Sequence, residues 1–249
     1  MRITLDNVGF SYPSGAAVLN GLSLEVVAGE FVLVVGRNGA GKSTLLKLLN
    51  GILKPTSGSV TIAGHPTGST PTATLARHAC VTFQNPADQI FAPTVFDEVA
   101  FAPRNLKRPD LQSLVGEALA LCHLEPFKDH HPYDLPLAQR KLLTVASALA
   151  SSAPFLAFDE PSAGLSQIEH QALEGIVKTL TARGVGFMVV SHDLSLFFRY
   201  ATRVVVLEGG RCTFSGGVSE LMQHEGVLRR AGLRLPVPLR IGRMLRKMQ

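Results

Sequence analysis

The spacing of apolar and polar positions changes along the chain, and each change marks a different predicted element. Residues 2–34 have the pattern of β structure, and the alternation of apolar and polar residues at 22–26 predicts an antiparallel β lobe. Residues 31–35 form instead a continuous apolar run that ends at Gly36, typical of a strand buried on both faces. Helical spacing follows over residues 42–50. The predicted order is β lobe, buried strand, glycine-rich loop and helix.

Two further apolar runs predict more buried strands in the second half. Residues 155–158 and 185–190 are these runs, and helical spacing fills residues 167–183 between them. Strands that alternate with helices form a parallel sheet. Residues 86–150 lack strand patterning and place alanine and leucine at helical spacing, so a helical insert is expected there. The predicted fold class is α/β, a parallel-sheet core with an antiparallel β lobe and an inserted helical part.

Composition excludes several classes of protein. The 249 residues are 46% hydrophobic and 17% charged, which supports a sizeable core and excludes intrinsic disorder and small disulfide-stapled folds. No apolar run approaches the roughly 18 to 20 residues of a membrane-spanning helix, and the N-terminus lacks the pattern of a secretory signal, so the cytosol is expected.

The chain has three cysteines, Cys80, Cys122 and Cys212, an odd number with no paired short spacing. We therefore expect reduced thiols that pack in the interior and no structural metal site.

The positive charge is concentrated at the end of the chain. The formal net charge is +5, and seven arginines and lysines fall between Arg229 and Lys247. A basic terminal helix can touch nucleic acid or anionic lipid, and it can equally be a solvated face opposite carboxylates of a partner chain.

A glycine-rich motif predicts phosphate binding. Residues 36–44 read Gly-Arg-Asn-Gly-Ala-Gly-Lys-Ser-Thr and fit G-x-x-x-x-G-K-[ST] between a strand and a helix. Successive backbone N–H groups and the helix N-terminus form a concave anion site. Lys42 is expected to reach the β- and γ-phosphates, and the Ser43 hydroxyl is expected to sit on Mg²⁺. The candidate nucleotide-binding residues in this loop are Asn38, Gly39, Gly41, Lys42, Ser43 and Thr44.

Charged side chains follow the two later strands. Asp159 and Glu160 come directly after residues 155–158, so Asp159 is expected to hold Mg²⁺ and Glu160 to polarise the attacking water as general base. His192 follows the strand that ends at Val190. Because the carboxyl ends of parallel strands share one edge of the sheet, His192 is expected beside the phosphate loop, within reach of the γ-phosphate.

These motifs together resemble an ATP-binding-cassette (ABC) ATPase over nearly the whole chain. The resemblance rests on the phosphate loop, Gln84 within residues 81–86, Asp-Glu-Pro-Ser-Ala-Gly-Leu at 159–165 and Ser-His-Asp at 191–193. Residues 10–13, 84–95 and 101–105 are similar to the energy-coupling-factor and cobalt-type branch of importer ATPases.

The resemblance implies further roles. Tyr12 would stack on adenine, and Gln84 would sense Mg²⁺ and the attacking water. Residues 1–225 would form the nucleotide-binding domain, with 86–150 as a helical subdomain facing a membrane partner, and the basic extension 226–249 would help two ATPases associate without any nucleic acid. The chain would be a peripheral motor on the cytoplasmic face of the membrane, working with an integral coupling protein and a substrate-binding membrane component.

One motif departs from the family pattern. Where the family has the signature Leu-Ser-Gly-Gly-Gln, the signature segment here (residues 135–139) reads Leu-Pro-Leu-Ala-Gln. Pro136 has no N–H, and Leu137 and Ala138 are bulkier than glycine. Pro136 is expected at the first helical position, so the helix should form. Losing a donor aimed at developing charge costs about 3 kcal/mol, so the site that this segment completes should turn over poorly.

The departure suggests a heterodimer. In a head-to-tail pair each nucleotide lies between one chain's phosphate loop and the other's signature, so a partner with an intact signature would complete this chain's site. Ser166, where the family usually has aspartate, is a second departure that would weaken communication between the sites.

Two other function classes stay open. A soluble ABC ATPase acting on nucleic acid or ribosomes has only the basic C-terminus in its favour. A P-loop kinase of a small metabolite leaves Tyr12, Gln84 and His192 without a role. By the resemblance the cargo would be a micronutrient, and cobalt, nickel and several vitamins are all compatible with the sequence.

Overall fold

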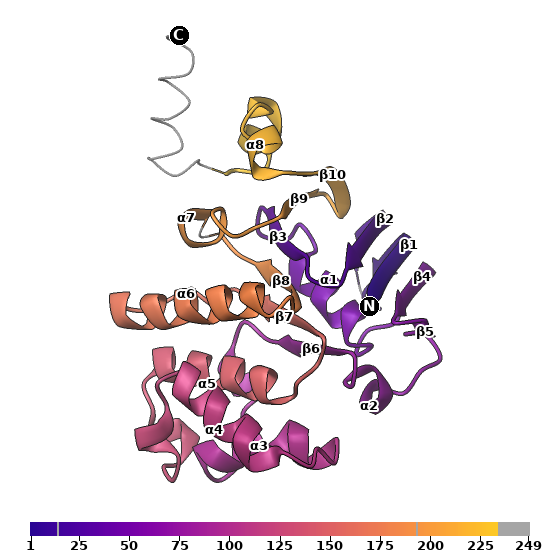
Figure 1. The fold of residues 1–249 in the computed structure, drawn as a ribbon. Helices are drawn as coiled ribbons and strands as arrows, with labels where there is room; N and C mark the ends of the chain where they lie inside the picture. The colour runs from indigo at the N-terminus through magenta and orange to yellow at the C-terminus, as the bar shows by residue number, and fades with distance from the viewer. Residues whose placement is uncertain (14, 193, 234–249) are drawn as a thin grey trace, which may run out of the picture.

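The structure, a computed structural model, describes residues 1–13, 15–192 and 194–233, which form two sheets and a group of helices (Figure 1). Asp193 of the Ser-His-Asp motif and most of the predicted basic extension, residues 234–249, lie outside the described residues. Within the described ranges, no helix combines the length and the apolar character that a membrane span needs.

The first sheet is the predicted antiparallel lobe. Its strand order is β2-β1-β4-β5. Leu5 pairs with Leu24 across β1 and β2, and Ile3 pairs with Ile62 across β1 and β4. Alternate residues of β1 are buried, as the period-two pattern predicts. The strands are β1 (Arg2–Ser11), β2 (Ala17–Val27), β4 (Ser57–Ile62) and β5 (His65–Pro66).

The second sheet has the order β10-β9-β3-β8-β7-β6 and is parallel except for the β9–β10 pair. Every residue of β3, β7 and β8 is buried, which confirms the three apolar runs as strands covered on both faces. Their carboxyl ends lie at one edge of the sheet, as expected. The strands are β3 (Phe31–Gly36), β6 (Ala79–Thr82), β7 (Phe155–Asp159), β8 (Gly186–Val190), β9 (Arg203–Glu208) and β10 (Arg211–Gly216).

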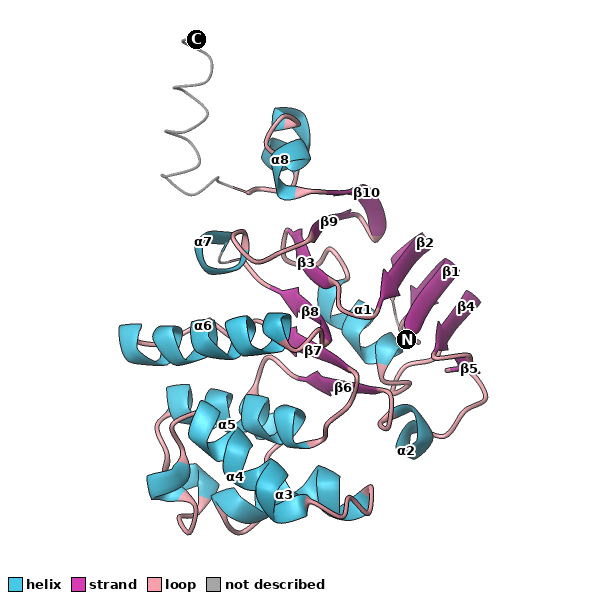
Figure 2. Cartoon of the chain, viewed as in Figure 1, coloured by secondary structure: helices cyan, strands magenta, loops and turns pink. Residues whose placement is uncertain are grey.

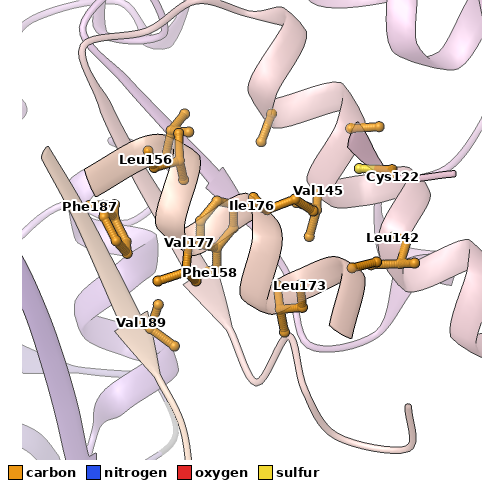
Figure 3. Packing of buried hydrophobic residues seen from close by; sticks show 14 of the residues in the cluster. Cys122, Leu142, Val145, Leu156, Phe158, Leu173, Ile176, Val177, Phe187 and Val189 are labelled. Carbon is orange, nitrogen blue, oxygen red and sulfur yellow. The ribbon is translucent and has the colours of Figure 1, made fainter. Parts of the chain in front are cut away.

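Helices cover both faces of this sheet. α1 (Lys42–Leu49) lies between it and the antiparallel lobe, where leucines such as Leu45 and Leu48 join the lobe's apolar residues in one cluster (Figure 1). α6 (Gln167–Ala182) covers the other face, and Figure 3 shows Leu173 and Ile176 of this helix between the sheet and α5 (Leu137–Ala150). The shorter helices are α2 (Thr72–Leu75), α7 (Leu194–Phe197), α8 (Val218–Leu221) and α9 (Glu225–Arg230).

Residues 86–150 form the expected helical insert. α3 (Val95–Asn105), α4 (Leu111–Leu121) and α5 pack on one another on the side of the molecule away from the antiparallel lobe (Figure 2). A short 3₁₀ turn at Pro86–Asp88 precedes α3, and two more, at Glu125–Phe127 and Pro132–Asp134, lie between α4 and α5. One detail of the prediction is wrong: Pro136 is the N-cap of α5 and not its first helical residue, because its ψ of 155° is extended.

The cysteine prediction is confirmed. All three are free thiols, and each packs against an apolar cluster, with Cys122 fully buried.

Candidate functional site

A cleft of about 430 Å³ opens at the carboxyl edge of the parallel sheet. It brings together the phosphate loop from the end of β3, Gln84 from beyond β6, the acidic pair from the end of β7 and His192 from the end of β8. The lining residues are Val18, Asn38, Gly39, Gly41, Lys42, Ser43, Thr44, Gln84, Asp159, Glu160 and His192. Sequence reasoning missed only Val18, an apolar residue of β2 that carries no chemical signal.

The phosphate loop leaves the N-terminus of α1 open toward the cleft. Gly41 is the N-cap of α1 with a φ of 97°, a left-handed conformation that favours glycine, and no side chain caps the helix. A Cβ at this position would lie 2.6 Å from Leu19 Cδ2 and 3.1 Å from the Val18 carbonyl oxygen, so β2 leaves little room for a larger residue. The uncapped N–H groups are therefore free of side-chain partners and suited to bind an anion.

Lys42 lies folded over the loop. Its side chain is almost fully buried, and Nζ donates hydrogen bonds to the carbonyl oxygens of Gly36 at 2.8 Å and Arg37 at 3.1 Å. Burial lowers the pKa of Lys42, while the carboxylates of Glu160 and Asp159 raise it. The ammonium group thus lies between the loop carbonyls and the acidic pair, where phosphate oxygens would find a positive charge.

Asp159 and Ser43 offer adjacent oxygen ligands. Asp159 is buried at the end of β7, and burial raises the pKa of its carboxyl, while a hydrogen bond with Ser43 and the charge of Lys42 lower it. Gln84, whose side chain carries an amide oxygen, lines the same cleft. Hydroxyl, carboxylate and amide oxygens are the hard donors that Mg²⁺ prefers, so these three residues fit a magnesium ion beside the phosphates.

Glu160 is held in an unusual conformation. Its φ of 49° is left-handed, which costs a non-glycine residue on the order of 1–3 kcal/mol. Its N–H donates to the Val190 carbonyl at 2.8 Å, so β8 fixes the backbone. Strain at this position, next to a cleft, is typical of a functional residue that the surrounding structure holds in place.

The carboxylate of Glu160 lies against His192. Oε2 accepts a hydrogen bond from the His192 backbone N–H at 3.2 Å, and Oε1 lies 3.2 Å from His192 Nε2. Oε1 is buried and forms no hydrogen bond with any described residue. Burial raises the pKa of Glu160, whereas His192 lowers it. A buried carboxylate oxygen that lacks a hydrogen bond is suited to accept a hydrogen bond from a water or a substrate.

Tyr12 lies at the rim of the cleft and not in its lining. Its hydroxyl is 3.4 Å from Thr44 Oγ1 in the first turn of α1, and its ring packs edge-on against Phe10 with centroids 4.9 Å apart. The half-exposed ring therefore stands beside the phosphate loop, where an adenine ring could stack on it.

The signature segment does not reach this cleft. Among the described residues that line it, none belongs to residues 135–139. The segment opens α5, where no side chain caps the helix and the side chain of Leu137 is 52% exposed. A proline ring and an exposed leucine thus stand at the start of α5.

Comparisons with known proteins agree with these features. The family model described as "ABC transporter" matches residues 19–163. The energy-coupling factor transporter ATP-binding protein EcfA of Methanocaldococcus jannaschii is 38% identical over 231 residues, which cover 91% of this chain and 83% of that protein. A putative ABC transporter ATP-binding protein of Streptomyces coelicolor is 36% identical over 94% of this chain and 90% of its own length.

Two solved structures have the same fold. CbiO1 from Clostridium perfringens, part of the ABC transporter complex CbiONQ, superposes with a TM-score of 0.76 at 30% identity and covers 98% of both chains. An ATP-binding cassette solved as a dimer in a post-hydrolysis state with ADP and Pi gives a TM-score of 0.79 at 27% identity, covering 87% of this chain and 98% of the cassette.

Proposed function

The chain belongs to the ABC transporter family of ATP-binding proteins, and from this premise we propose that it is the motor of an energy-coupling-factor type importer. It is an ATPase whose hydrolysis is coupled to transport. The observation that carries the proposal is the meeting of Lys42, Asp159, Glu160 and His192 in one cleft at the sheet edge. The cargo would be a vitamin or a transition-metal ion, which the motor never contacts.

The loop and α1 bind the triphosphate. Phosphate oxygens accept from the N–H groups of residues 38–44, and Lys42 exchanges the carbonyls of Gly36 and Arg37 for the β- and γ-phosphates. Tyr12 stacks on the adenine. Ser43, Gln84 and Asp159 would hold Mg²⁺, which would neutralise charge on the phosphates.

Glu160 acts as general base, and His192 lies beside it and contacts the γ-phosphate. Burial raises the pKa of Glu160, which brings its basicity closer to neutral pH. The backbone N–H of His192 holds one carboxylate oxygen, and the other, which lies 3.2 Å from His192 Nε2, would accept the proton of the attacking water. The imidazole, half exposed to the cleft, is within reach of the γ-phosphate.

The competent site is shared between two chains, and the partner is a different ABC ATPase. Two copies of this chain would each present Pro136 and Leu137 to the other's nucleotide, and neither supplies the donors of the family signature. A partner with an intact signature would complete the site built on Lys42 and Glu160. The second site, closed by residues 135–139, would bind ATP more than hydrolyse it.

The helical subdomain, residues 86–150, faces the membrane protein. Phe91 and Phe101 expose 63% and 46% of their surface and meet edge-to-face with ring centroids 4.6 Å apart. Buried Glu98 fixes the loop that carries Phe91, since its carboxylate accepts the N–H groups of Phe91 and Ala92 at 3.0 and 2.9 Å. Phe101 lies on α3. An exposed aromatic pair with one ring on a fixed loop and the other on a helix is suited to receive an apolar element of a partner. Residues 1–225 form the nucleotide-binding domain, peripheral to the cytoplasmic face, and 226–249 form the basic extension.

Co-expression and fractionation test this proposal. The chain should sediment with membranes only when an integral coupling protein of this transporter class is co-expressed. Phe91→Glu combined with Phe101→Glu should return it to the soluble fraction, whereas the matched change at exposed Ile52, Ile52→Glu in the other part of the molecule, should not. A chain that stays soluble beside the coupling protein but phosphorylates a metabolite would be a kinase, and the proposal would be wrong.

A further inference from the structure

The side chain of Lys141 crosses from α5 to the turn that follows β7. Its Nζ donates a hydrogen bond to the Ala163 carbonyl oxygen at 2.6 Å and lies 3.4 Å from the Glu160 carbonyl oxygen as a second acceptor. Lys141 is half-buried and does not line the nucleotide cleft. One ammonium group therefore joins the two ends of the turn formed by residues 160–163.

This turn has weak hydrogen bonds of its own. The Ala163 N–H donates to the Glu160 carbonyl at 3.3 Å, and the Leu165 N–H donates to the Ser162 carbonyl at the same distance. The turn also begins at Glu160, whose left-handed backbone needs support from its surroundings. Charge-assisted hydrogen bonds are roughly twice as strong as neutral ones, so Lys141 is the strongest described tie on the carbonyl side of this turn.

Local charge favours the same arrangement. Burial lowers the pKa of Lys141, while the charges of Glu160 and Asp159 act in the opposite direction. The two carboxylates thus favour the charged form of the Lys141 side chain, and its charge in turn lowers the pKa of Asp159.

We propose that Lys141 is a positioning residue that fixes the backbone of Glu160 from the helix that carries the signature segment. Lys141 lies two residues after the signature segment (residues 135–139), at the start of α5. This part of the inference rests on the proposed function. There, the start of α5 contacts the nucleotide bound by the partner's phosphate loop, and the turn at residues 160–163 carries Glu160, the general base for the nucleotide bound by this chain's own loop. A shift of the start of α5 would then be transmitted to Glu160 through one side chain.

The activity test compares two substitutions in the full chain. Lys141→Met keeps the length of the side chain and removes its donor, whereas Lys141→Arg keeps donor and charge. We expect Lys141→Met to lower kcat about tenfold or more, with KM for ATP changed less than about twofold, and Lys141→Arg to recover part of the loss. Arg140→Met is the matched control, since the Arg140 guanidinium lies over the Tyr133 ring, 5.3 Å from its centroid, and not at the turn. It should leave kcat unchanged.

Hydrogen exchange tests the positioning without any turnover. In the nucleotide-free chain, Lys141→Met should speed exchange of the amides of Ala163 and Leu165 about tenfold, while exchange within β7 and β8 stays as in the wild type. Unchanged exchange at the turn would overturn the inference, and so would a kcat within about twofold of the wild type. If Glu160→Gln left turnover intact, the proposed function would fail, and the exchange result would still decide the role of Lys141.

Discussion

If the proposed heterodimer is correct, replacing the signature segment by the family signature should speed ATP hydrolysis by this chain alone. The perturbation is the triple change Pro136→Ser, Leu137→Gly and Ala138→Gly at the start of α5. It adds a backbone N–H and a hydroxyl at the N-cap, where neither exists, and it removes a leucine side chain that is 52% exposed. The chain alone could then form a symmetric pair in which both sites have donors for the γ-phosphate.

The expected magnitude follows from the donors gained and the helix propensity lost. A donor aimed at charge that develops in the transition state is worth about 3 kcal/mol, or roughly a hundredfold or more in rate. Two glycines in the first turn of α5 cost roughly 1 kcal/mol each in stability. The helix should persist because Leu142, Leu143 and Val145 bury its apolar face in the core.

Steady-state phosphate release from the purified chain is the assay. The restored variant should hydrolyse ATP about a hundredfold faster per chain than the wild type. Pro136→Ala with Leu137→Ala is a matched control that recovers the N–H without the hydroxyl or the bare backbone, and it should recover only part of this rate. A wild-type chain that already matches the restored variant would refute the reasoning, because the native segment would then be no handicap.

Four further outcomes follow from the site. Glu160→Gln should bind ATP, lose turnover by about a hundredfold or more and accumulate in the associated form; phosphate release and gel filtration check this, and intact turnover would remove Glu160 from its role. Because burial raises the pKa of Glu160, kcat should fall on acidification at a pH above the usual value for glutamate, about 4.3, and a fall only below that pH would contradict a buried base. Tyr12→Ala should weaken ATP binding by about 1–3 kcal/mol while Tyr12→Phe keeps it, as measured by calorimetry, and equal affinities would exclude stacking. Gly41→Ala should lower the thermal unfolding midpoint, because the new Cβ is strained and meets Leu19 Cδ2 at 2.6 Å; an unchanged midpoint would show that the loop can relax.

The sequence predicts the strands that are buried on both faces. β3, β7 and β8 are apolar throughout because both faces are covered, so the pattern and the burial agree. β6 has only four residues, Ala-Cys-Val-Thr, and becomes a strand by pairing with β7, which no local pattern reveals. β9 is a different case: four buried apolar residues, 204–207, carry the same signal as β3, and the pattern could have been used to predict it.

Some features of the site are likewise predictable from the sequence, and others are not. The phosphate loop, Asp159 and His192 follow strands at predictable positions, so the shared sheet edge is enough to bring them into one cleft. The left-handed backbone of Glu160 is not predictable, because local preference disfavours it and it is held by contacts with residues distant in sequence, such as the Val190 carbonyl. The bridge from Lys141 joins a helix to a turn 22 residues further along the chain, and it depends on packing alone.

Mixing two chains that each hydrolyse ATP slowly tests most directly whether one ATP is hydrolysed between two subunits. One chain carries the restored signature with Lys42→Ala, so it offers a signature and no phosphate site; the other is the wild type, with a phosphate site and residues 135–139 as they stand. Each alone should be slow, and the mixture should hydrolyse ATP about a hundredfold faster than the sum of the two. Replacing the wild type by Glu160→Gln in the mixture should abolish the gain. A mixture no faster than its separate components would contradict a nucleotide site built from two chains.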